Sequence, residues 1–179
     1  MPVGTANANI TARDALLAEF DHEIATTRKL LERLPGGSSR DDVALTWRPH
    51  PKSMTLGALG THIATISTWA SRVLDETHFD LSDAPPAAEA LASRDEILAR
   101  FAEASAAARK ALDNDDAEYA AMWTLTRDGH EVFSMPRVAV FRSFVLSHLI
   151  HHRGQLSVYL RLNDIPVPAI YGPSADEGQ

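Results

Sequence analysis

Leu56-Gly-Ala-Leu59-Gly-Thr-His62-Ile63-Ala-Thr-Ile66-Ser-Thr-Trp-Ala70-Ser-Arg-Val73 is the stretch that decides the fold. Its apolar residues are spaced three and four apart, which is the spacing of one face of an α-helix. The pattern runs without a break, so it predicts one helix that begins near Ser53 or Thr55, either of which could cap it, and ends before Asp80. An apolar stripe of this length is typical of the inner face of a helix bundle.

Three further segments have helical spacing. The first runs from about Thr11 to Leu34 and ends at the Pro-Gly-Gly that follows. The next begins at Ser93, where Ser93-Arg-Asp-Glu96 forms a capping box in which the serine caps the Glu96 amide and Glu96 reaches back. The last begins at about Pro136, which suits a first helical position, and continues to about Leu162.

A β-hairpin is predicted just before the last helix. Trp123-Thr-Leu-Thr126 and Glu131-Val-Phe133 flank Asp128-Gly129, and Asp-Gly supplies the positive φ angles of a type I′ turn. Together the segments predict an all-α fold, an antiparallel four-helix bundle with a small β-hairpin before the fourth helix. We expect one domain over residues 1–179, with an extended C-terminal tail at residues 163–179.

The composition excludes several classes of function. The chain has no cysteine, so a bound metal must use His, Asp or Glu ligands. Its net charge of −7 repels phosphate backbones, so we expect no nucleic-acid partner. No apolar run approaches the ~20 residues of a membrane span, and the first ten residues lack the pattern of a signal peptide. We therefore expect a cytoplasmic protein with no membrane partner.

The histidines are the candidate functional residues. With about 100° per residue along the last helix, His148 and His152 fall about 20° to either side of Phe141, in the middle of the apolar stripe, whereas His151 falls about 80° away on its flank. Residues four apart on a helix lie close enough for two imidazoles to converge on one ion. His62 borders the apolar stripe of the second helix and is the third candidate ligand. All eight histidines are His22, His50, His62, His78, His130, His148, His151 and His152.

Two interpretations of these three histidines remain open from spacing alone. Buried imidazoles are costly unless they are neutral and bonded, and a shared metal would satisfy that need. Alternatively, His62, His148 and His152 are separate core histidines bonded to backbone or side chains. Gln155 and Tyr159 also face inward by the same phase argument; they could bond a metal ligand or a substrate, but hydrogen bonds between helices are the favoured interpretation. Trp47, Trp69 and Trp123 are expected in the core.

The last helix and its continuation resemble a known family. His148-Leu-Ile-His-His152-Arg-Gly-Gln-Leu-Ser-Val-Tyr-Leu-Arg, followed by Ile165-Pro-Val-Pro-Ala-Ile-Tyr-Gly-Pro-Ser174, is similar to the C-terminal signature of the DinB family, within the DinB/YfiT-like metalloenzyme superfamily. Lys52-Ser-Met-Thr-Leu-Gly-Ala-Leu-Gly-Thr-His62 and the Trp123 to Arg137 segment also match. The resemblance implies a bundle with a long crossover, a homodimer, and a divalent metal, zinc or nickel, held by His62, His148 and His152.

Two functions follow as hypotheses. The first is a metal-dependent enzyme, because three protein ligands leave an open position for water or substrate. The resemblance implies chemistry on a low-molecular-weight thiol, as in an S-transferase, or hydrolysis; no general base or nucleophile can be assigned from the sequence. The alternative is a non-enzymatic metal-binding protein with a role in stress response or protein interaction.

Overall fold

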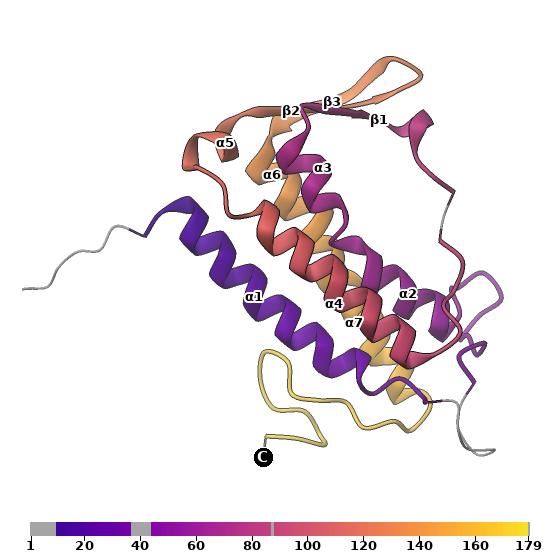
Figure 1. Cartoon of the computed structure of the whole chain (residues 1–179). Coiled ribbons are helices and arrows are strands. Elements are labelled where there is room, and N and C mark those ends of the chain that lie inside the picture. Colours follow the sequence, from indigo (N-terminus) through magenta and orange to yellow (C-terminus); the bar gives the residue numbers. More distant parts are fainter. Residues whose placement is uncertain (1–9, 37–43, 87, 179) are drawn as a thin grey trace, which may run out of the picture.

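A computed structural model describes residues 10–36, 44–86 and 88–178, and this part of the chain is mostly helical with one small sheet (Figure 1). The helices are α1 Ala12–Leu31, α2 Leu56–Ile66, α3 Trp69–Asp75, α4 Arg94–Ala111, α5 Asp116–Ala120, α6 Arg137–Phe141 and α7 His148–Arg161, with a 3-10 turn η1 Leu81–Asp83 and a π-helical turn η2 Arg142–Ser147. The strands are β1 His78–Asp80, β2 Met122–Arg127 and β3 His130–Pro136.

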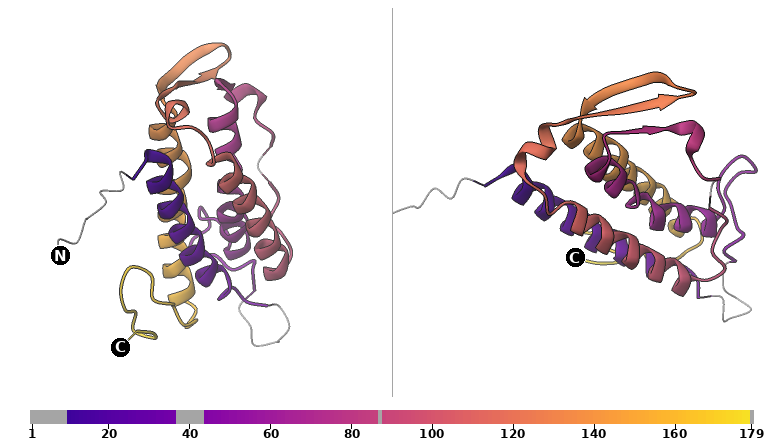
Figure 2. Two further views of the ribbon diagram at one scale, coloured as in Figure 1. Left: turned by 60° about the vertical axis from the view of Figure 1, so that its left-hand side comes forward. Right: turned by 45° about the horizontal axis from the view of Figure 1, so that its top comes forward.

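The long helices enclose the hydrophobic core. Both α1 and α2 contact α4 and α7, and the two views of Figure 2 show the helical segments running alongside one another beneath the sheet. One contiguous core cluster fills the space between them, and the deeply buried side chains include Phe20, Leu30, Leu59, Ile63, Phe101, Phe141, Leu149, Leu156 and Leu160. The arrangement places α2 directly against α7, the two helices that carry the three candidate histidines.

The second helical segment is interrupted, which the unbroken apolar spacing did not predict. It begins as expected after Thr55, whose hydroxyl accepts a hydrogen bond from the Ala58 N–H (3.1 Å), but α2 ends at Ile66 and α3 starts at Trp69. The Thr65 hydroxyl donates to the carbonyls of Thr61 and His62, and the Thr68 hydroxyl donates to that of Thr65. Such back-bonding hydroxyls bend helices, and a run of them explains the break.

The fourth helical segment is also not one continuous α-helix. Pro136 precedes its first helical residue instead of occupying that position, and the six residues of η2 separate α6 from α7. A π-helical turn holds one residue more than an α-helical turn, so every later side chain is rotated relative to an unbroken α-helix. This rotation decides how His148 and His152 are placed.

The predicted β-hairpin is confirmed, and it gains a third strand. β2 and β3 pair antiparallel around a two-residue turn in which Asp128 and Gly129 have φ angles of 52° and 76°. β1, which was not predicted, pairs parallel to β2. The Asp80 carboxylate joins β1 to the hairpin turn by accepting hydrogen bonds from the N–H groups of Gly129 (2.9 Å) and Ser82 (2.8 Å), and these bonds hold the pKa of Asp80 well below its usual range.

The start of α4 follows the capping box with one difference. The Ser93 hydroxyl accepts from the Glu96 N–H (3.2 Å) as predicted, but the Glu96 carboxylate accepts from the Ala92 N–H (2.9 Å), one residue before the expected one.

The C-terminal tail, predicted to be extended, lies against the rest of the domain. Its described part forms no helix or strand beyond the end of α7, yet it folds back along α1 and α7. Asp176 pairs with Arg161, and the Tyr171 hydroxyl donates to the buried Glu23 carboxylate (2.9 Å). Over the residues that the structure describes, no helix is both long and apolar enough to cross a membrane.

Candidate metal centre

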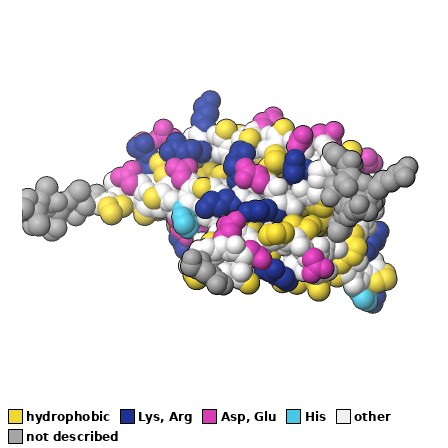
Figure 3. Space-filling view, turned by 90° about the horizontal axis from the view of Figure 1, so that it is seen from below, with side chains coloured by type: hydrophobic (Ala, Val, Ile, Leu, Met, Phe, Trp, Pro, Cys, Tyr) yellow, Lys and Arg dark blue, Asp and Glu magenta, His cyan; other side chains and the backbone are white. Residues whose placement is uncertain are grey.

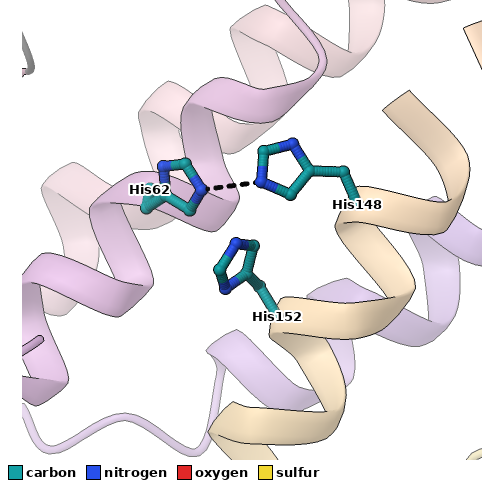
Figure 4. A group of neighbouring side chains, drawn as sticks. All are labelled: His62, His148 and His152. Carbon is teal, nitrogen blue, oxygen red and sulfur yellow. Dashed lines mark hydrogen bonds between the residues drawn. The ribbon is translucent and has the colours of Figure 1, made fainter. Parts of the chain in front are cut away.

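Three histidines from two helices meet at one point. His62 lies on α2, His148 is the first residue of α7, and His152 follows one turn later (Figure 4). The three rings turn toward one another, with centroid separations of 5.0 Å (His62 and His148), 4.4 Å (His62 and His152) and 4.7 Å (His148 and His152). The structure therefore brings together all three candidate residues that the sequence indicated.

The ring nitrogens are spaced as ligands to a single ion would be. One nitrogen from each ring lies within 4.8 Å of the others, and the Nε2 atoms of His62 and His148 are 3.1 Å apart. Two imidazoles at tetrahedral positions around zinc would place their nitrogens about 3.3 Å apart, since each Zn–N distance is about 2.0–2.1 Å. His62 and His148 already have this spacing, and the cluster of three could hold a metal ion. A direct N–H···N hydrogen bond between His62 and His148 is the alternative explanation of the 3.1 Å distance.

Burial keeps these imidazoles neutral at neutral pH. Desolvation and the neighbouring His152 and His148 lower the pKa of His62 to about 4. Desolvation also lowers the pKa of His148 and of His152; the backbone carbonyl of Phe144 in η2 acts against this at His148, and Gln155 does so at His152. A neutral imidazole has a free lone pair, which is the form that binds a metal.

Gln155 orients one of the three rings. Its side-chain oxygen lies 2.8 Å from His152 Nδ1, which leaves Nε2 of that ring directed to the other two histidines. The side-chain nitrogen of Gln155 lies 3.0 Å from Nε2 of His151. Gln155 is exposed and its bonds are within its own helix, so the expectation that it faces inward and bonds between helices is wrong.

His151 stands outside the cluster, as predicted. It is exposed, whereas His148 and His152 are half-buried, and the described residues contain one group of side chains with metal-ligand spacing, which does not include His151. The reason is not the predicted one, because the buried stripe of α7 consists of Leu149, Arg153, Leu156 and Leu160. The two ligand candidates therefore lie on the flank of the stripe, where both are half-buried and His148 lines a cavity.

A cavity of about 550 Å³ adjoins His62 and His148. Trp69, Phe79 and Ile66 form its apolar wall, and Arg72 and Arg100 also line it. Trp123 is buried as expected. Trp69 is half-buried, where it packs against the core and also lines the cavity, and Trp47 is half-buried against Tyr159. Sequence reasoning missed Arg72, Phe79 and Arg100, because they come from three separate elements and share no local motif.

These observations define the class of protein: a mostly helical chain with an open three-histidine cluster beside a cavity. The chain belongs to the DinB family, whose sequence profile it matches over residues 5–179. It is 27% identical over 166 residues to the uncharacterized protein YrdA of Bacillus subtilis strain 168, a match that covers 92% of this chain and 90% of that protein. The fold is similar to the crystal structure of a DinB-like protein from Bacillus cereus ATCC 10987, with a TM-score of 0.66, 23% identity, and coverage of 90% of this chain and 99% of that one.

Proposed function

We propose that the protein binds one divalent transition metal through His62, His148 and His152, and that it is a metal-dependent enzyme acting on a small molecule. The convergence of three neutral, half-buried imidazole rings on one point, beside a cavity, is the observation that carries the proposal. The donor set fits such an ion, because imidazole suits zinc, nickel and copper, and zinc or nickel is the ion we expect. Three protein ligands with an open side is the arrangement of catalytic sites, whereas structural sites are closed by a fourth ligand.

The residues around the site support binding and orientation. Gln155 sets the orientation of His152, and the Phe144 carbonyl in η2 faces His148. When bound, the metal would supply Lewis acidity, which lowers the pKa of a coordinated water or thiol and so suits hydrolysis or thiol transfer. The cavity wall would hold the substrate against His62 and His148. A non-enzymatic metal-binding protein is the alternative, and the cavity beside the ligands favours the enzyme.

The four helical segments also support the bundle expected from the sequence. We take α1, α2 with α3, α4, and α6 with α7 to be its four members, with the connection through β1 and η1 as the long crossover. The homodimer stays a prediction, to be tested by sedimentation of the full chain.

Cobalt titration tests the metal proposal. The unmodified protein should bind close to one Co²⁺ per chain and develop the visible absorption bands of a nitrogen-ligated ion. His148→Ala should lose these bands, whereas His151→Ala should keep them, since His151 is the matched control three residues along the same helix. Equal loss in both variants, or no bands in the unmodified protein, would contradict the proposed site. Adding small thiols to the cobalt form then tests the chemistry: a spectral shift supports thiol coordination, and no response to any thiol counts against thiol transfer.

A further inference from the structure

The cavity beside the three histidines has the chemistry of a binding site for one class of molecule. We propose that it binds a small carboxylate with an apolar, preferably aromatic, body, and that Arg72 of α3 and Arg100 of α4 recognise the carboxylate group. The proposal rests on the proposed function in one respect only: the metal would act on the part of the molecule that lies against His62 and His148. The cavity volume of about 550 Å³ falls within the range of small-molecule sites.

The charge of the cavity is opposite to that of the protein. The chain as a whole carries a net charge of −7, yet the described residues that line the cavity include two arginines and no aspartate or glutamate. The remaining lining residues are mainly apolar or aromatic, with Met54, Ile66, Trp69, Phe79 and Pro85 among them. A positive local field within an apolar wall favours an anion that carries hydrocarbon, and disfavours both a neutral apolar molecule and a highly charged one.

Arg72 is positioned to donate hydrogen bonds to such an anion. Its guanidinium carbon lies 4.2 Å from the centroid of the Phe79 ring, and the residue is half-buried. Stacking occupies the flat face of the guanidinium and leaves the N–H groups, which lie in its plane, at the edge. Among the ion pairs between described residues none includes Arg72. A carboxylate can therefore be bound there without breaking an existing ion pair.

Arg100 already forms one ion pair, but this pair is weak. Its NH1 group donates to Glu103 at 2.8 Å, an exposed pair three residues apart on α4. Such pairs contribute little free energy because water screens them, so an anion in the cavity can take the place of Glu103.

The other polar groups of the cavity are less suited to binding an anion. The hydroxyl groups of Thr65 and Thr68 donate to backbone carbonyls, with Thr68 Oγ1 at 2.7 Å from the Thr65 oxygen. A hydroxyl that already donates its proton can only accept a further hydrogen bond. An ionised carboxylate has no proton to donate, so it cannot bond to such a hydroxyl. The imidazoles of His62 and His148 face each other, with their Nε2 atoms 3.1 Å apart. The guanidinium groups are thus the strongest donors on the wall, and charge-assisted bonds from Arg to carboxylate are among the strongest in proteins.

Calorimetric titration of the metal-free full chain tests this inference, with hydrocinnamate and its neutral isostere hydrocinnamamide as the probes. The acid should bind at least about tenfold more tightly than the amide, because only the acid pairs with the arginines. Equal affinity for the two probes, or no binding of either up to about 10 mM, would overturn the proposal. This comparison needs no variant and therefore does not depend on how a substitution affects folding.

Arginine variants locate the carboxylate. Arg72→Met should weaken hydrocinnamate binding at least about tenfold and leave the weak amide binding unchanged; Arg72→Lys should fall between, since it keeps the charge and loses the planar donor pair. Arg127→Met, at the exposed hairpin turn, is the matched control and should bind like the unmodified protein. Loss of acid binding in Arg127→Met to the same extent would overturn the assignment. The titration is done without metal, so the two proposals can fail separately. If the protein binds the acid but fails the cobalt test, only the proposed function is refuted. If it binds cobalt but not the acid, only this inference is refuted.

Discussion

Gln155 decides which nitrogen of His152 is presented to the other two imidazoles. Its side-chain oxygen accepts the proton of Nδ1, so the lone pair of Nε2 is left for an ion. We predict that Gln155→Leu lowers zinc affinity by about tenfold to a hundredfold with all three histidines intact, the usual effect of removing a partner that orients a ligand. Competition with a chromophoric chelator measures it. His151→Ala removes the other partner of Gln155 and should leave zinc affinity unchanged; unaltered affinity in Gln155→Leu would show that this hydrogen bond does not prepare the site.

The pKa values of the three imidazoles determine how protons compete with the metal. Each pKa is lowered, that of His62 to about 4, so at pH 6 the metal-free site carries fewer protons than three free imidazoles would. A lower pKa means that fewer protons must be displaced, so we predict that zinc binding at pH 6 releases fewer protons than the about two expected for three unperturbed imidazoles of pKa ~6.5. Calorimetry in two buffers of different ionisation enthalpy counts the protons. Release of two or more would mean that burial does not lower these pKa values.

The identity of the three histidines could be predicted from the sequence, but their environment could not. A uniform helical wheel drawn from Phe141 places His148, His152, Gln155 and Tyr159 inward, whereas the buried residues of α7 are each one position later. The π-helical turn η2 supplies that one-residue shift, and no residue pattern in Arg142–Ser147 signals it. The angle around the helix axis between His148 and His151, which are three residues apart, is unaffected because both residues follow the π-helical turn. His151 therefore lies outside the cluster, as predicted, although the position predicted for it relative to the buried stripe was wrong.

At the scale of elements, a buried ion pair holds α7 against α1. Arg153 and Glu23 are paired at 2.5 Å with side chains only 2% and 7% exposed, and Arg153 also donates to the Thr27 hydroxyl (3.3 Å). The Tyr171 hydroxyl from the tail donates to the same carboxylate. The pair thus ties together α1, α7 and the tail, and it adjoins His152 in the sequence. Spacing predicted a helix bundle, but an arginine among the leucines of the stripe could not be recognised as buried, because charged residues usually mark the exposed face.

Breaking this pair should be costly. We predict that Arg153→Met or Glu23→Gln lowers the free energy of unfolding by about 3–5 kcal/mol, since each leaves a buried group without its partner. The double variant Arg153→Met, Glu23→Gln should be less destabilised than the sum of the single variants, because no unpaired charge remains. Urea denaturation at neutral pH measures all of these. A loss below about 1 kcal/mol in both single variants would mean that the pair is as weak as a surface pair.

At the scale of the whole molecule, a bound metal would join α2 to α7. An ion that binds the folded state alone stabilises it by about 2.7 kcal/mol at a hundredfold excess over its dissociation constant. We therefore predict that zinc raises the midpoint of thermal unfolding, that a chelator reverses the effect, and that His148→Ala abolishes it. Scanning calorimetry with and without chelator measures the shift. An equal rise in His148→Ala would place the stabilising ion elsewhere.

Much of the overall architecture follows from periodicity, whereas the interruptions do not. The helical segments and the Asp128-Gly129 hairpin turn were predictable because each is encoded by neighbouring residues. The strand β1 depends on pairing with a segment more than forty residues away, and the cavity is assembled from α2, α3, β1, α4, α7 and the loops beside them, so neither leaves a local pattern. On the face shown in Figure 3, basic and acidic side chains lie interspersed.

The central claim is that His62, His148 and His152 share one metal ion, and anomalous diffraction at the metal absorption edge tests it most directly. Crystals of protein purified without chelator should show one anomalous peak per chain, with an imidazole nitrogen of each of the three histidines about 2.0–2.2 Å from it and at least one position open to the cavity. No peak at full resolution, or a peak bound by other residues while His62 and His148 remain hydrogen-bonded to each other, would contradict the claim.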